Sequence, residues 1–298
     1  MERISDRLAL WVLRSIAVAL LFFGASMLMA GAPAVSILTE SAVGRSIAWI
    51  FVQIAIGFII AGTAAIYLSR LHGPLLPNER LATSDTSRAP LGGWVMAFAV
   101  TFVVLPVWLV YRLQPLFDGW AVVIDYLSTW DWSGANAAGS GLVLLPVAAA
   151  LTPPAFQLCA ALFLTATSVM LFVLLLLRSS RFPRIYGVCL VLSAALVFAG
   201  VRSAAAAVLA GDAALQIIQD TAASADESAQ LTEGLQRYTG IVGSTAPVLL
   251  WTWFGYLVWL SPLLFSRRAT STFARRSAAR IVTPATAADL EAITSPPA

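Results

Sequence analysis

The amino-acid sequence predicts an all-α, polytopic membrane protein with six transmembrane helices and with both termini in the cytoplasm. Hydrophobic residues make up 59% of the 298 residues and charged residues 11%, against about 45–50% and about 25% in soluble domains. Six apolar segments are long enough to cross a bilayer, which takes about 20 residues at 1.5 Å each. The arginines gather in alternate connecting segments. These observations exclude a soluble enzyme, a disordered regulator and a secreted disulfide scaffold.

The apolar segments give the predicted spans in chain order. They are Ile16–Pro33, Ile47–Leu68, Gly92–Tyr111, Ala155–Leu177, Ile185–Leu209 and Ile241–Phe265. A seventh apolar stretch, Leu142–Leu151, is too short to span and precedes Pro153 and Pro154. We therefore expect it to form an interfacial or re-entrant piece.

The arginines decide how the predicted spans thread through the bilayer. All 18 basic residues are arginine, and fourteen of them fall on one side if the N-terminus is inside: Arg3, Arg7, Arg14, Arg70, Arg80, Arg88, Arg178, Arg181, Arg184, Arg267, Arg268, Arg275, Arg276 and Arg280. Cytoplasmic segments carry the excess of basic residues. An odd number of spans would place either the N-terminal arginines or the tail on the wrong side.

A rival interpretation takes residues 1–32 as a cleaved signal peptide, because Ala30-Gly31-Ala32 resembles a cleavage site. Leu8–Ala32 is long for a signal h-region, which has about 7–15 apolar residues. Arg14 also interrupts the early apolar stretch, and we expect it to extend toward the inner headgroups. The sequence thus favours a first transmembrane helix over a signal peptide.

The chain divides into four predicted parts. Residues 1–69 form a two-helix hairpin, residues 70–88 a polar cytoplasmic linker, and residues 89–275 a four-helix unit. Residues 276–298, rich in Ala, Thr, Ser and Pro, are predicted to be a disordered tail.

Three motifs mark the four-helix unit. They are the start Gly92-Gly93-Trp94, with Pro106 in the helix that follows, the turn Arg181-Phe182-Pro183-Arg184, and the closing set Trp259, Ser266, Arg268, Thr272 and Phe273. In this order they resemble the bacterial inner-membrane family catalogued as domain of unknown function two-five-six-nine, with its GGW start, FPR-type loop and W-x6-S-x-R-x3-T-F end. Many members have Pro-Tyr soon after the tryptophan, whereas here Pro262 is displaced by one position and the tyrosine is missing. The resemblance implies architecture and a bacterial inner-membrane location, and no activity.

A physical role can also be predicted for each motif. Gly92 and Gly93 leave the backbone unrestricted where the chain enters the bilayer, and Trp94 suits the interface. Pro106 removes a helical hydrogen bond and is expected to kink its helix unless neighbours compensate. Arg181 and Arg184 form a cationic turn toward anionic lipid, where each charge is worth about 1 kcal/mol.

The closing motif falls at helical spacing if the sixth helix continues past the membrane. Ser266 and Thr272 would then bond the backbone of the 178–184 turn. The alternative is a helix that lies on the lipid surface with no partner.

The ionisable residues argue against catalysis and proton coupling, because no Asp, Glu or His lies in any predicted span. Arg202 is the candidate charge in a span. It either extends outward or pairs with Asp125 or Asp212, or else it holds an anion or a lipid headgroup. His72 has no partner histidine, so we expect no metal site. We also expect no cofactor and no catalytic residue.

The uncharged polar residues of the spans are expected to join helices: Gln53, Thr165, Thr167, Ser168, Ser193 and Thr252. Cys159 and Cys189 are interpreted as small core residues.

Two outer loops are predicted. Residues 114–154 hold three tryptophans and Asp118, Asp125 and Asp131, which favours an interfacial aromatic belt over a ligand surface or a catalytic set. Residues 211–240 hold five acidic residues against Arg237. There the spacing of Leu215, Ile218 and Ala222 predicts an amphipathic helix on the outer surface.

The sequence thus favours a non-enzymatic membrane protein that acts through contacts. The expected partners are the lipid bilayer and a membrane protein or a second copy of this chain, not nucleic acid. The alternative is a small-solute transporter or channel with Pro106, Pro262 and Leu142–Leu151 as mobile elements. A third class, a lipid-modifying enzyme, requires the outer aspartates to converge with Arg202. A continuous polar cavity at the midplane would favour transport, whereas a dry core would oppose it.

Overall fold

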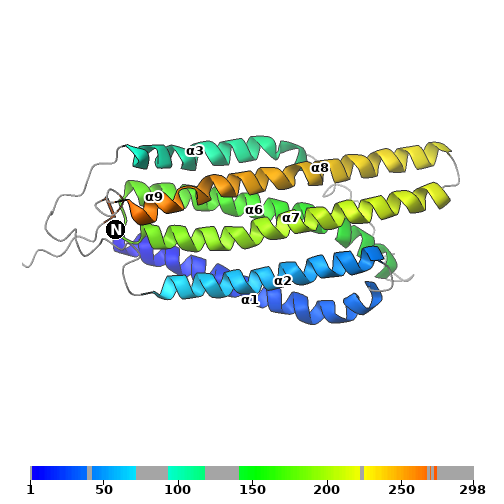
Figure 1. The fold of residues 1–298 in the computed structure, drawn as a ribbon, viewed down its shortest axis with the longest axis horizontal. Helices are drawn as coiled ribbons and strands as arrows, with labels where there is room; N and C mark the ends of the chain where they lie inside the picture. The colour runs from blue at the N-terminus through cyan, green and yellow to red at the C-terminus, as the bar shows by residue number, and fades with distance from the viewer. Residues whose placement is uncertain are drawn as a thin grey trace, which may run out of the picture.

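The computed structural model describes residues 2–38, 42–71, 93–117, 141–221, 225–266, 269 and 272–273. Its helices lie side by side in one elongated bundle (Figure 1). They are α1 (Glu2–Leu38), α2 (Ala42–Arg70), α3 (Trp94–Arg112), α6 (Gly141–Leu176), α7 (Phe182–Thr221), α8 (Ala225–Leu257) and α9 (Leu260–Phe265).

The prediction of an all-α protein with six spans is confirmed. Six stretches of helix among the described residues are long and apolar enough to cross a membrane: Ile4–Met29, Ala42–Arg70, Trp94–Arg112, Pro153–Leu176, Phe182–Ala213 and Thr232–Phe265. The chain is a multi-pass membrane protein.

The two ends of the described chain lie at the same end of the bundle. Asp6 of α1 accepts a hydrogen bond from Ser179, which precedes α7, and Phe273 stacks on Phe182 at the start of α7. We call this end, which also holds the last turn of α2 and the first turn of α3, the proximal end, and the opposite end the distal end.

The N-terminal hairpin packs lengthwise against α7. Gly187 of α7 faces Leu68 of α2 so closely that an added Cβ would lie 2.9 Å from Leu68 Cδ2. Eleven residues farther along both helices, Gly57 meets Phe198. Four residues beyond, Arg202 donates a hydrogen bond to Gln53. The equal steps show that α2 and α7 run antiparallel and in register, with small residues allowing close approach.

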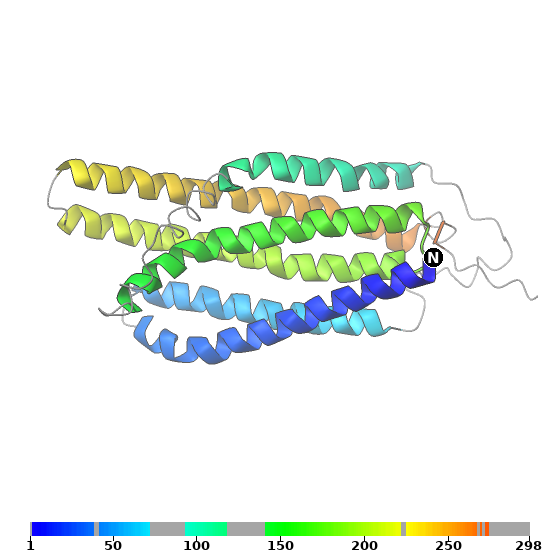
Figure 2. The ribbon, with the colours of Figure 1, turned by 180° about the vertical axis from the view of Figure 1, so that it is seen from behind.

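The helices α7 and α8 continue well beyond the distal ends of α2 and α3 (Figures 1 and 2). The segment 211–240, predicted as an outer loop, is therefore helical where the structure describes it, and the candidate spans end at Ala213 and begin again at Thr232 within it. Leu215 and Ile218 belong to α7 itself and not to a separate surface helix, while Ala222 lies outside the described residues. The polar residues indicated a loop because hydropathy reports contact with lipid and not helix formation.

The apolar stretch Leu142–Leu151 is also not a separate piece, because it forms the first turns of α6. These turns run at an angle to the rest of the helix (Figure 2). The helix continues through Pro153 and Pro154, which lack the N–H groups that straight helical geometry uses, so a bend there is expected.

The sixth predicted span is interrupted. Helix α8 ends at Leu257 and α9 begins at Leu260. The ring of Pro262 would conflict with the carbonyl group of Val258 in a continuous helix. Tyr186 Oη of α7 donates to the Tyr256 carbonyl oxygen at 2.5 Å, next to the break.

Candidate functional site

An aromatic cluster at the proximal end brings the three sequence motifs together. Trp94 stacks on Trp259, with ring centroids 6.3 Å apart. Phe98 lies 5.4 Å from Trp259 and 5.9 Å from Phe182. Phe182 in turn stacks on Phe273 at 4.9 Å. The residues of the motifs therefore fix α3, α7, α9 and the segment after α9 against one another.

The closing motif does not continue the sixth helix, although its helical spacing would have allowed that. Ser266 has extended backbone angles, φ −80° and ψ 131°, and follows the last residue of α9. Its Oγ accepts a hydrogen bond from Trp94 Nε1 at 3.2 Å. Beyond it, Thr272 and Phe273 are buried, so the alternative of a lipid-surface helix without a partner is wrong. Arg268 lies outside the described residues.

The start motif behaves as its glycine predicts. Gly93 caps α3 with φ 59° and ψ −137°, a combination that residues with a Cβ rarely adopt. Its carbonyl oxygen accepts the Met96 N–H at 3.1 Å. Gly92 lies outside the described residues. Pro106 is buried inside α3, and the helix continues past it to Arg112.

The turn between α6 and α7 is closed by a Schellman motif. The Ser179 N–H donates to the Leu174 carbonyl and the Arg178 N–H to the Leu175 carbonyl, at 3.1 and 2.9 Å. Arg178 takes the position with positive φ, 50°, that glycine usually occupies. In this turn Arg181 is exposed, and its N–H donates to Ser179 Oγ at 3.2 Å.

Asp6 is a buried carboxylate that the sequence analysis missed. It is 3% exposed, and Ser179 Oγ, itself fully buried, donates to its Oδ1 at 2.7 Å. The predicted first span began at Ile16, which assigned Asp6 to a solvated tail. Helix α1 begins at Glu2, so Asp6 joins the bundle and connects α1 to the turn before α7.

Arg14 makes a second contact at the proximal end. Its Nε and Nη2 donate to Ser69 Oγ and O at 2.9 and 2.7 Å. Arg14 therefore caps the C-terminal end of α2.

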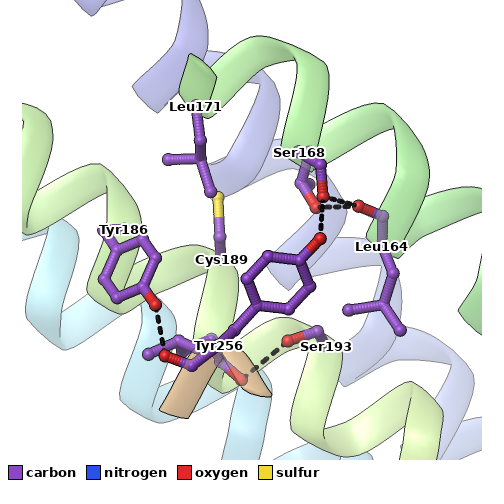
Figure 3. A pocket seen from close by; sticks show the side chains of 9 residues that line it. Leu164, Ser168, Leu171, Tyr186, Cys189, Ser193 and Tyr256 are labelled. Atoms are coloured by element: carbon purple, nitrogen blue, oxygen red, sulfur yellow. Dashed lines mark hydrogen bonds between the residues drawn. The ribbon is translucent and has the colours of Figure 1, made fainter. Parts of the chain in front are cut away.

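A small cavity lies between α6, α7 and α8 (Figure 3). Its polar lining includes Ser168, Tyr186, Ser193 and Tyr256, with Cys189 beside them. Ser168 Oγ and Tyr256 Oη are 2.5 Å apart, and either can donate. The cavity offers about 10 Å³ for the centre of a water molecule, which is close to the minimum for one water. It is too small for any solute larger than water.

Six polar residues of the spans were predicted to join helices, and only some of them do. Ser168 bonds Tyr256 across α6 and α8, and Gln53 bonds Arg202 across α2 and α7. Thr167, Ser193 and Thr252 instead donate to carbonyl groups of their own helices. The Thr165 hydroxyl makes no hydrogen bond within the described part of the chain.

Gln157 is an interhelical residue that sequence reasoning missed. It is fully buried in α6. Its Nε2 donates to the Val242 carbonyl and its Oε1 accepts from Thr245 Oγ1, both on α8 and both at 2.7 Å. An amide side chain inside an apolar span was the available signal.

The cysteines divide between the core and the surface. Cys189 is buried, as predicted, but Cys159 is exposed on the outside of the bundle. An apolar run does not distinguish the two positions in a membrane protein, because the surrounding lipid is as apolar as the core.

Arg202 bonds a neutral amide and not Asp212, one of the acids considered as its partner. Its Nη2 donates to Gln53 Oε1, whereas Asp212 is exposed on α7, ten residues or about 15 Å farther along the helix. Asp118, Asp125 and Asp131 lie outside the described residues, so the convergence with Arg202 that a lipid-modifying enzyme would require is not tested.

Comparisons with protein-family models, with curated proteins and with solved structures find no match to this chain. Its function is therefore argued from its own geometry.

Proposed function

We propose that the chain is a non-enzymatic protein of the bacterial inner membrane that acts through contacts with lipid or with another membrane protein. The motifs over residues 89–275 support membership in the family with domain of unknown function two-five-six-nine. In this proposal the proximal end is cytoplasmic, because Arg70, Arg178 and Arg181 lie there and basic residues favour that side.

The small size of the cavity in the part of the bundle that the structure describes is the observation that carries the proposal. The cavity between α6, α7 and α8 has room for about one water, and the hydroxyl groups of Ser168, Tyr186 and Ser193 each make a hydrogen bond inside the bundle. Buried polar groups that bond one another hold a packed structure together and are not available to a passing solute. A function at the surface is the simpler consequence.

The bundle also presents surfaces at both ends. At the distal end, α7 and α8 form a hairpin that extends beyond α2 and α3 (Figure 1), and Asp212 and Glu233 are exposed on it. At the proximal end, the half-buried Arg178 and the exposed Arg181 lie beside the aromatic cluster. The first surface suits a polar or basic partner, and the second suits anionic lipid.

A small-solute transporter or channel is the second candidate. The break between α8 and α9, at Val258 and Trp259, favours it because interrupted helices supply mobile elements and backbone groups in transporters. Such a function needs a second conformation in which the cavity beside Tyr256 widens and connects to water.

The test is native mass spectrometry of the full chain, released from its own membranes in gentle detergent without added ligand. A protein or lipid companion in fixed stoichiometry supports the contact function. A bare, monodisperse chain contradicts it, and flux measured in liposomes then decides for or against transport.

A further inference from the structure

Arg202 lies in the distal half of the candidate span Phe182–Ala213 of α7. It follows Phe182, the first residue of α7, by twenty residues, which is about 30 Å of helix. The hydrocarbon core of a bilayer is also about 30 Å thick. Taking the proximal boundary at the aromatic cluster, to which Phe182 belongs, puts the guanidinium group one hydrocarbon thickness away, at the depth of the lipid phosphates of the distal leaflet.

The charge of Arg202 is not neutralised by any carboxylate of the described residues. Its hydrogen bond goes to the neutral Oε1 of Gln53, and its buried Nε has no hydrogen-bond partner in the described part of the chain. A guanidinium group has five N–H donors, so most of them remain. An uncompensated cation beside the hydrocarbon core is costly, and such residues mark functional sites in membrane proteins.

The side chains next to Arg202 along α2 and α7 suit a lipid. Toward the bilayer centre lie Ile56 and Phe198, 43% and 41% exposed. Toward the distal surface lies Trp49, one turn beyond Gln53 and 61% exposed. Apolar side chains exposed below the arginine can contact acyl chains, and a tryptophan above it fits the headgroup region.

We propose that Arg202 and Gln53 form a binding site for the phosphodiester of a membrane phospholipid in the distal leaflet. The hydrogen bond to Gln53 Oε1 holds one side of the guanidinium group, and the remaining η donors bind the phosphate oxygens, a geometry that arginine favours. The Gln53 amide nitrogen supplies further N–H donors beside them. This site rests on the proposed contact function and names one ligand class for it.

The test uses the purified full chain in detergent, titrated with phosphatidylglycerol, with diacylglycerol of the same acyl chains and, separately, with inorganic phosphate, and read by native mass spectrometry. The variants are Arg202→Gln and Gln53→Glu. The matched control is Arg112→Gln, which removes an exposed arginine at the distal end of α3.

We expect the natural chain and Arg112→Gln to bind one phosphatidylglycerol at this site and to bind diacylglycerol and inorganic phosphate at least about tenfold more weakly, because charge-assisted hydrogen bonds and acyl contacts both contribute. Arg202→Gln should lower phosphatidylglycerol affinity about tenfold or more. Gln53→Glu should do the same with Arg202 still present, since its carboxylate neutralises the arginine internally. This second variant keeps the test valid if Arg202→Gln fails to fold.

Equal phosphatidylglycerol binding by Gln53→Glu and the natural chain would overturn the proposal. Equal binding of diacylglycerol would show that acyl contacts alone hold the lipid, and equal binding of inorganic phosphate would assign the site to the free anion. Either result refutes a phospholipid site. The contact function is judged separately, by companions captured from native membranes.

Discussion

Replacement of Gln157 by leucine should weaken the contact between α6 and α8. Gln157 makes two interhelical hydrogen bonds, to the Val242 carbonyl and from Thr245 Oγ1. Leucine has a similar size, so the change removes these bonds without opening a large cavity. Thr245 keeps its bond to the Val242 carbonyl at 2.9 Å, so neither partner on α8 is left without a hydrogen bond.

The expected loss is about 1–3 kcal/mol of unfolding free energy, because interhelical hydrogen bonds in membranes average about 0.6 kcal/mol and reach about 1.7 kcal/mol each. The assay is reversible unfolding in mixed micelles with rising SDS fraction, followed by circular dichroism. Ser193→Ala is the matched control. Ser193 is 3% exposed and donates to Leu190 of its own helix, so its loss should cost less than about 1 kcal/mol. Equal costs for the two variants, or no cost for Gln157→Leu, would refute the interhelical role.

The same unfolding assay checks two backbone predictions. Gly62→Ala should destabilise the N-terminal hairpin by about 1–3 kcal/mol, because its Cβ would lie 2.7 Å from the Ala17 carbonyl oxygen. The control Gly240→Ala, whose Cβ meets no atom within 4 Å, should be neutral or stabilising. A larger loss of stability in Gly240→Ala than in Gly62→Ala would contradict the packing. Arg178→Gly should raise stability by about 1 kcal/mol, because φ is 50° at this position and a left-handed backbone costs residues with a Cβ about 1–2 kcal/mol. A destabilised Arg178→Gly would show that the side chain outweighs the strain.

The spans could be predicted from the sequence because a bilayer imposes both length and hydropathy on them. The helix ends could not. Residues beyond Gly211 are polar and were interpreted as a loop, yet Gly211 packs so closely on Thr239 that a Cβ would lie 2.6 Å from its Cγ2. The two helices continue because they pack on each other, and hydropathy does not report that contact.

The candidate site was predictable in its parts and not in its contacts. Trp94, Phe182 and Phe273 were singled out as motif residues, but nothing in their spacing shows that their rings meet. Asp6 was missed because its position relative to the apolar segment suggested solvent, whereas the burial of Asp6 depends on Ser179, far away in the sequence. Gln53 was not considered as the partner of Arg202, because sequence gives no register between helices and only the register of α2 on α7 brings the two together.

Cysteine labelling tests most directly whether the cavity between α6, α7 and α8 is closed to water. Cys189 lines the cavity and is 3% exposed. In the Cys159→Ser variant, Cys189 is the remaining cysteine of the chain, and a water-soluble maleimide applied to native membranes reports its access to water. The closed bundle predicts no labelling of Cys189 until SDS unfolds the protein, and full labelling afterwards. Rapid labelling in intact membranes would show a water-filled path to the core and would contradict a function confined to surface contacts.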